Sequence, residues 1–171
     1  MAESDEIGEL FLTFSRERLQ LLASRVADCL GRLSDEQIWQ RGSEVENSVA
    51  NLVLHLCGNV RQWIISGVGG QPDIRERDAE FGRRDGVTTS ELRELLESTI
   101  AESVSVIQNM QHDRLVEKIS VQGRNPSVLE AIYVVVEHFG EHAGQIMYTT
   151  KQMTREDLGY HRHLSVQKST R

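Results

Sequence analysis

Proline, cysteine and aromatic residues are all scarce in this sequence, and it has no long hydrophobic run. Two prolines and two cysteines occur among 171 residues, and aromatic residues make up 5%. The cysteines do not form a C-x-x-C pair, and a chain of this length can bury a core without disulfides, so we expect a cytoplasmic protein. No apolar segment approaches the roughly 18 residues of a membrane span, so we expect no membrane insertion.

Basic residues are outnumbered by acidic ones. The chain has 19 Lys and Arg against 26 Asp and Glu, which gives a formal net charge of −7. Binding to a phosphate backbone requires clustered positive charge, because the affinity comes from counterion release. We therefore expect no nucleic-acid partner. Six histidines, in a chain with only nine aromatic residues, are the feature that composition does not explain.

Hydrophobic periodicity predicts four long helices. Apolar residues recur at three- and four-residue steps, and capping patterns precede the later segments. The expected helices cover residues 5–33, 48–66, 88–110 and 127–153, with a short helical turn after Ser34. The sequence thus predicts an all-α four-helix bundle over residues 1–153, followed by a polar tail over residues 154–171.

The connection between the second and third expected helices is unusually long. It covers residues 67–87, and a loop of this length in a compact bundle is usually functional or mobile. Arg75 or Arg77 could bind a substrate carboxylate at the mouth of a site. Alternatively, these arginines order the connection through ion pairs with neighbouring acidic residues, namely Asp73, Asp78 and Glu80.

Three histidines have the helical spacing of a metal site. His138 and His142 are four residues apart in the last expected helix, so their side chains point within about 40° of each other. His55 lies in the second expected helix on a polar stripe that comprises Asn51, His55, Asn59 and Gln62. If these two faces meet, three imidazoles can bind one metal ion and leave coordination positions open, as catalytic sites do.

The histidines also have alternative interpretations. A single buried histidine in a bundle is more often a hydrogen-bonded core residue, and an exposed H-x-x-x-H pair is more often a solvated helix face. The letters H-x-x-E-H also match the inverted zinc-peptidase pattern, in which Glu141 would be the general base. That reaction needs a further acidic ligand well downstream, and only 29 residues follow His142. We keep Glu141 as a candidate base beside a metal, and Asn59 as a candidate substrate contact.

Two segments carry a resemblance to a known superfamily. NLVLHL at residues 51–56 and HFGEHAGQ at residues 138–145 resemble the DinB/YfiT-like superfamily, and RERDAEF at residues 75–81 is similar to a subgroup of small bacterial DinB-like proteins, mostly uncharacterised. The resemblance extends from the first helix to about Met153. It implies a four-helix bundle, often a homodimer, in which three histidines bind one divalent metal, namely His55, His138 and His142.

The resemblance also implies a class of chemistry. The superfamily includes metal-dependent thiol transferases and a thiol-dependent isomerase, so we expect a metal-dependent thiol transferase or a hydrolase. Its substrate would be a low-molecular-weight thiol or another small molecule. Zn or Ni are the first candidates for the metal, with Fe, Mn or Cu as alternatives. The competing hypothesis is a non-catalytic bundle that binds metal or dimerises through an apolar helix face.

Overall fold

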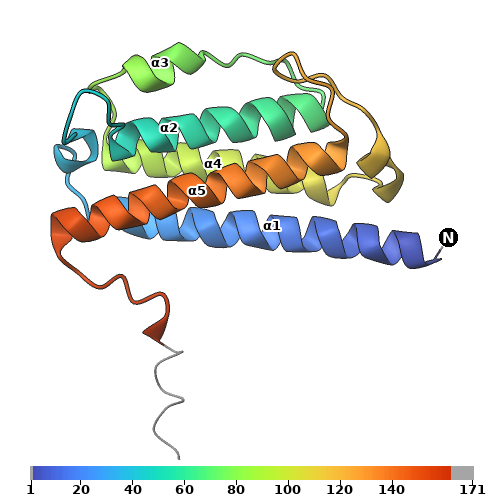
Figure 1. Ribbon diagram of the computed structural model, residues 1–171, viewed down its shortest axis with the longest axis horizontal. Helices are drawn as coiled ribbons and strands as arrows, with labels where there is room; N and C mark the ends of the chain where they lie inside the picture. The colour runs from blue at the N-terminus through green and yellow to red at the C-terminus, as the bar shows by residue number, and fades with distance from the viewer. Residues whose placement is uncertain (1, 163–171) are drawn as a thin grey trace, which may run out of the picture.

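Four long helices lie side by side in the computed structural model of the chain, which describes residues 2–162. Helices α1 and α5 pack together, α4 packs against α1, and α2 packs against both α4 and α5 (Figure 1). The bounds of the four are α1 Ala2–Leu30, α2 Val49–Val60, α4 Thr89–Gln108 and α5 Val128–Thr154. The predicted all-α four-helix bundle is confirmed. Among the described residues there are only two isolated β-bridges, in the turn that precedes α5.

Capping boxes begin three of these helices. The side chains of Ser48, Thr88 and Ser127 each accept a hydrogen bond from the backbone N–H three residues later. Each such cap stabilises its helix by about 0.5–2 kcal/mol. At the start of α5, hydrogen bonds from the backbone and side chain of Ser127 lower the pKa of Glu130 to about 2. The caps place the first turns of α2 and α5, and thereby the register of the histidines that these helices carry.

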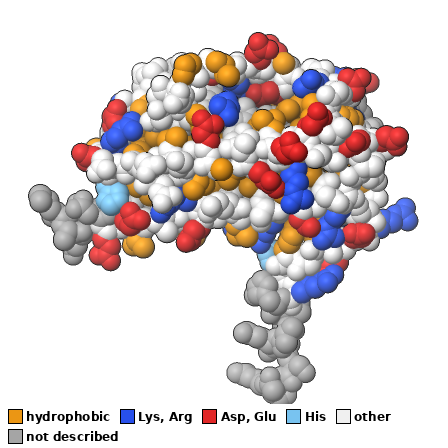
Figure 2. All heavy atoms as spheres, turned by 180° about the vertical axis from the view of Figure 1, so that it is seen from behind, with side chains coloured by type: hydrophobic (Ala, Val, Ile, Leu, Met, Phe, Trp, Pro, Cys, Tyr) orange, Lys and Arg blue, Asp and Glu red, His pale blue; other side chains and the backbone are white. Residues whose placement is uncertain are grey.

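A single hydrophobic core lies between the four helices. It takes side chains from every long helix, and its largest fully buried members include Leu19, Leu56, Leu96, Ile132 and Phe139. Outside this core, acidic and basic side chains are interspersed on the face seen from behind, with hydrophobic side chains between them (Figure 2). None of the described helices is both long and apolar enough to cross a membrane.

The second predicted helix changes its winding before it ends. We predicted one helix over residues 48–66, whereas α2 continues as a π-helix, η2, over Arg61–Val68. In its last turn the N–H of Gly69 donates to the carbonyl of Ile64, five residues earlier. Such wide turns are rare, and a segment of eight residues is too short for its apolar pattern to reveal the change.

The long connection contains a short helix that the sequence did not predict. Helix α3 (Arg77–Gly82) lies over α2, where we expected a bare loop (Figure 1). Gly70 and Gly86 have φ angles of 75° and 83°, a left-handed backbone that favours glycine, at the two ends of this segment. We call residues 70–86 the strap. A helix of six residues is too short to show hydrophobic periodicity.

The chain after α5 turns back onto α1. Leu158 is buried, and the hydroxyl of Tyr160 donates a hydrogen bond to Oδ2 of Asp28 at 2.7 Å. The first part of the predicted polar tail therefore packs on the bundle. Residues 163–171 of that tail lie outside the described residues.

Candidate metal centre

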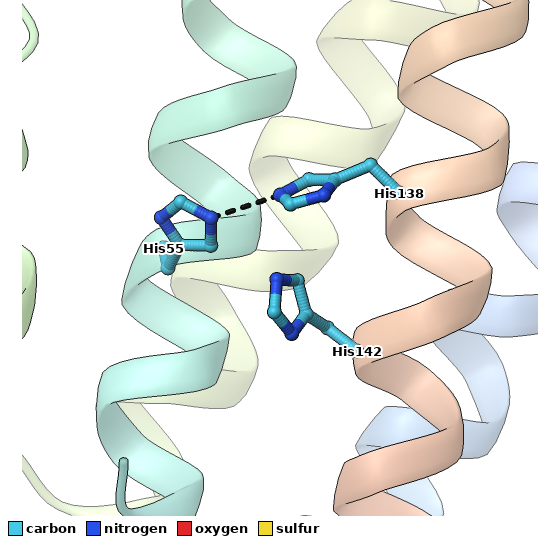
Figure 3. Close-up of side chains that lie close together, drawn as sticks. All are labelled: His55, His138 and His142. Atoms are coloured by element: carbon cyan, nitrogen blue, oxygen red, sulfur yellow. Dashed lines mark hydrogen bonds between the residues drawn. The ribbon is translucent and has the colours of Figure 1, made fainter. Parts of the chain in front are cut away.

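Helices α2 and α5 bring the three predicted histidines together (Figure 3). The ring centroids of His55, His138 and His142 lie 4.4–5.1 Å apart. One ring nitrogen from each lies within 4.8 Å of the other two. His55 is buried, and the other two are partly buried. The helix faces that carry the three histidines therefore meet, while metal ligation itself stays a prediction.

The nitrogens fit a single divalent ion. Zn–N bonds of 2.0–2.1 Å place two imidazole nitrogens of a tetrahedral site about 3.4 Å apart. Nε2 of His55 lies 2.8 Å from Nε2 of His138, and the largest separation in the cluster is within 4.8 Å. The required spacing falls between the 2.8 Å contact and the 4.8 Å limit, so the three nitrogens could hold one metal ion. Three imidazoles suit Zn, Ni, Fe or Cu.

Two of the histidines each have a polar side chain beside their Nδ1 atom, which orients the ring. Oε2 of Glu80 lies 3.0 Å from Nδ1 of His55, and Oε1 of Gln145 lies 2.7 Å from Nδ1 of His142. A histidine that binds a metal through Nε2 keeps its ring proton on Nδ1, where such oxygens accept it. Partners of this kind fix the orientation of a ligand and raise its basicity.

Glu80 also forms a buried ion pair with Arg75. Nε of Arg75 donates to Oε1 at 2.7 Å and Nη2 donates to Oε2 at 2.8 Å, and both side chains are at most 10% exposed. Burial alone would raise the pKa of Glu80, but hydrogen bonds from Arg75 and His55 outweigh it and the pKa is lowered. The carboxylate is therefore ionised where it supports His55. Of the ion pairs predicted for Arg75, the one with Glu80 is present.

The polar stripe, which runs along α2 into η2, holds the strap in place. Nδ2 of Asn51 donates to the backbone carbonyls of Glu80 at 2.7 Å and Arg83 at 3.0 Å, and Oε1 of Gln62 accepts from Nη1 of Arg75 at 2.9 Å. The sequence placed Asn51, His55, Asn59 and Gln62 on one helix face and made His55 a metal ligand if that face meets the face of the last helix. In the structure His55 does lie with the other histidines, and Asn51 and Gln62, at the two ends of the stripe, bind the strap.

A side chain at Gly58, which lies under the ion pair, would have to displace that pair. A Cβ atom built there would collide with Oε1 of Glu80 and would lie 3.0 Å from Nε of Arg75. Sequence reasoning missed both Gly58 and the role of Glu80. The glycine itself was a detectable signal in the sequence. Glycine inside an apolar helix costs about 1 kcal/mol relative to alanine, so its presence indicates that another group packs closely against the helix.

The other predicted site residues lie around the cluster. Oε2 of Glu141 is 3.9 Å from Nδ1 of His138, on the ring edge away from His55. The guanidinium of Arg77 lies 4.9 Å from the ring centroid of Phe81, and that ring packs 4.6 Å from the ring of His55. Asn59 is buried on α2, one turn after His55. The base and substrate-contact roles assigned to these residues stay predictions.

A family comparison covers nearly the whole chain. The model of the family described as "Protein of unknown function (DUF1572)" matches residues 6–170. The chain belongs to the DUF1572 family. No curated protein matches it.

Several solved structures have a fold similar to that of this DUF1572 chain. A conserved protein from Enterococcus faecalis has a TM-score of 0.69 at 15% identity, over 84% of this chain and 97% of that one. A DinB-like protein from Bacillus subtilis has a TM-score of 0.66 at 14% identity, over 84% and 94%. One from Bacillus cereus has a TM-score of 0.62 at 15% identity, over 77% and 85%. The DinB-like resemblance is confirmed at the level of the fold.

Burial favours the neutral form of two of the clustered imidazoles of this DUF1572 chain, those of His138 and His142. Desolvation, followed by repulsion from His142 and His55, lowers the pKa of His138 to about 4. Desolvation also lowers the pKa of His142. A neutral imidazole is the form that binds a metal ion. The lowered pKa values of His138 and His142 are therefore compatible with metal binding near neutral pH.

We expect the metal-free protein to lose stability as the pH falls from about 6.5 to about 4. Over this range His138 takes up a proton in the unfolded chain but not in the folded one, so the unfolded state binds more protons and acid favours it. Urea unfolding in the presence of a chelator at several pH values measures the effect. Comparison with His138→Gln removes the contribution of other groups, and an equal pH dependence in both proteins would contradict this prediction.

Proposed function

We propose that this chain binds one divalent metal ion through His55, His138 and His142 and uses it to activate a small thiol for transfer. The observation that carries the proposal is the convergence of three ring nitrogens within 4.8 Å from two helices. Three protein ligands would leave coordination positions for a substrate, as in catalytic rather than structural zinc sites. Zn and Ni are the first candidates for the ion.

The chemistry follows from the donor set. A divalent ion with open positions holds a thiol as its thiolate, which is the nucleophilic form. The protein's part is to orient the ligands through Glu80 and Gln145 and to limit access on one side through Phe81, which packs on His55. The position of Arg77 over Phe81 supports a role in holding an acidic substrate group near this opening.

Two observations favour thiol transfer over hydrolysis in this proposal. The sequence resembles a superfamily that includes metal-dependent thiol transferases. A hydrolase would use the metal to lower the pKa of bound water to about 7, with a general base beside that water. The candidate base, Glu141, contacts the outer edge of His138, away from the ring nitrogens that converge.

An exposed apolar stripe on α1 supports a homodimer. Ile7, Leu10 and Phe14 are each more than 60% exposed and recur at three- and four-residue steps on one helix face. Apolar side chains that gather in this way often mark an interaction surface. This stripe is also the observation that favours the second candidate function, a bundle whose role is to associate rather than to catalyse.

The test combines metal analysis with a transfer assay. Untagged protein is loaded with Zn or Ni, and cysteine or N-acetylcysteine is offered with an aryl chloride, so that a C–S bond forms and chloride and a proton leave. We expect one metal per chain and metal-dependent transfer, which His142→Ala abolishes and the exposed His161→Ala leaves intact. Stoichiometric metal without transfer to any acceptor would overturn the thiol chemistry, and absence of stoichiometric metal would overturn the site.

A further inference from the structure

A pocket lies between the strap, α2 and α4, next to the metal centre but separate from it. Its volume of about 680 Å³ lies within the usual range for small-molecule sites. Its lining contains none of the three clustered histidines. One wall is the Arg75–Glu80 ion pair, whose other side contacts His55. The pocket therefore has its own set of lining residues, and it shares only this ion pair with the metal centre.

The interior of the pocket is mainly apolar. Leu54, Cys57 and Gly58 come from one face of α2, while Ile74 of the strap and Leu95 of α4 form the opposite sides. Ile74 is 73% exposed and Leu95 is 36% exposed, so apolar surface in the concavity remains uncovered. Burial raises the pKa of the Cys57 thiol to about 12, so this side chain stays protonated and acts as apolar wall rather than as a nucleophile.

The side chains that line the pocket carry one more positive than negative charge. Its lining holds three arginines and two glutamates, namely Arg61, Arg75, Arg83, Glu76 and Glu80, in a chain whose net charge is −7. Arg75 and Glu80 neutralise each other, and Arg61 pairs with Glu102, which is not in the lining. Arg83 and Glu76 have no ion-pair partner among the described residues, and both lie exposed on the strap. Arg83 is the best-placed cation for a ligand's negative group.

We propose that this pocket binds a small apolar carboxylic acid. The hydrocarbon part lies over Leu54, Cys57 and Ile74, and the carboxylate faces Arg83. Burial of the exposed apolar walls supplies the affinity, and the guanidinium supplies the preference for an acid over a neutral or basic molecule. This binding site does not depend on the proposed metal chemistry, because no metal ligand lines the pocket.

Titration calorimetry with three eight-carbon probes tests the proposal on the full chain without metal. We expect octanoate to bind saturably at one site, octanol to bind more weakly, and octylamine not to bind. Arg83→Gln should weaken octanoate binding by about two- to fivefold, as expected for an exposed ion pair. Arg124→Gln removes the same charge from an exposed arginine outside the lining and should change nothing.

Filling the pocket locates the site. Ala79→Trp on the strap and Leu95→Trp on α4 enter it from opposite sides, and either should weaken octanoate binding at least tenfold while the protein stays folded by circular dichroism. His142→Ala should bind octanoate like the wild type even if it loses metal, so the two proposals can fail separately. Absence of saturable octanoate binding, equal binding of octylamine, or unchanged binding in both folded tryptophan variants would overturn this proposal.

Discussion

Replacing His55 with alanine should abolish stoichiometric divalent-metal binding. His55 is the only one of the three clustered histidines on α2, so its removal leaves two imidazoles one turn apart on α5. Loss of an outer-sphere partner typically costs 10–100-fold in metal affinity, and a direct ligand should cost about 100-fold or more. Competition with a chromophoric chelator gives the affinity, and elemental analysis gives the stoichiometry.

Two further measurements separate loss of the ligand from loss of the fold. A ligand that binds only the folded state raises its stability by about 2.7 kcal/mol at a concentration of 100 Kd. Added metal should therefore raise the melting temperature of the wild type but not that of His55→Ala. His161→Ala, which removes an exposed histidine outside the cluster, should behave like the wild type. If His55→Ala retained one tightly bound ion per chain, the assignment of the site would be wrong.

The sequence can indicate which histidines share a helix face, because side-chain directions on a helix follow a fixed period. A separation of four residues places His138 and His142 on one face whatever the rest of the fold does. Capping boxes at Ser48 and Ser127 fix where their helices begin. That the faces of α2 and α5 meet does not follow from either helix alone. The resemblance to a known superfamily implied it, and the structure shows it.

The support around His55 could not be predicted in the same way. Glu80 lies 25 residues from His55 in the chain, on a six-residue helix with no periodicity to reveal it. Its position depends on hydrogen bonds from Asn51 and on the ion pair with Arg75, which are contacts between segments rather than within one. Local patterns predict local structure, and only the folded strap brings these groups together.

Gly58 permits a stringent test of this arrangement, because one added methyl group should weaken metal binding without changing a ligand. Helix propensity alone predicts that Gly58→Ala stabilises α2 by about 1 kcal/mol. The structure instead predicts a harmful change, because the new Cβ collides with Oε1 of Glu80 and displaces the carboxylate from His55. We expect metal affinity to fall about 10–100-fold and the strap to become more susceptible to proteolysis.

A matched glycine and a double variant isolate the cause. A Cβ at Gly144, on α5, meets nothing within 4 Å, so Gly144→Ala should leave metal affinity unchanged. Glu80→Ala should itself weaken metal binding, because it removes the support of His55. If the collision with Glu80 is the cause, adding Gly58→Ala to Glu80→Ala should cost little further, and the two losses should be strongly non-additive. Additive losses would mean that Gly58 acts on the site by another route, and wild-type affinity in Gly58→Ala would mean that the carboxylate does not position His55.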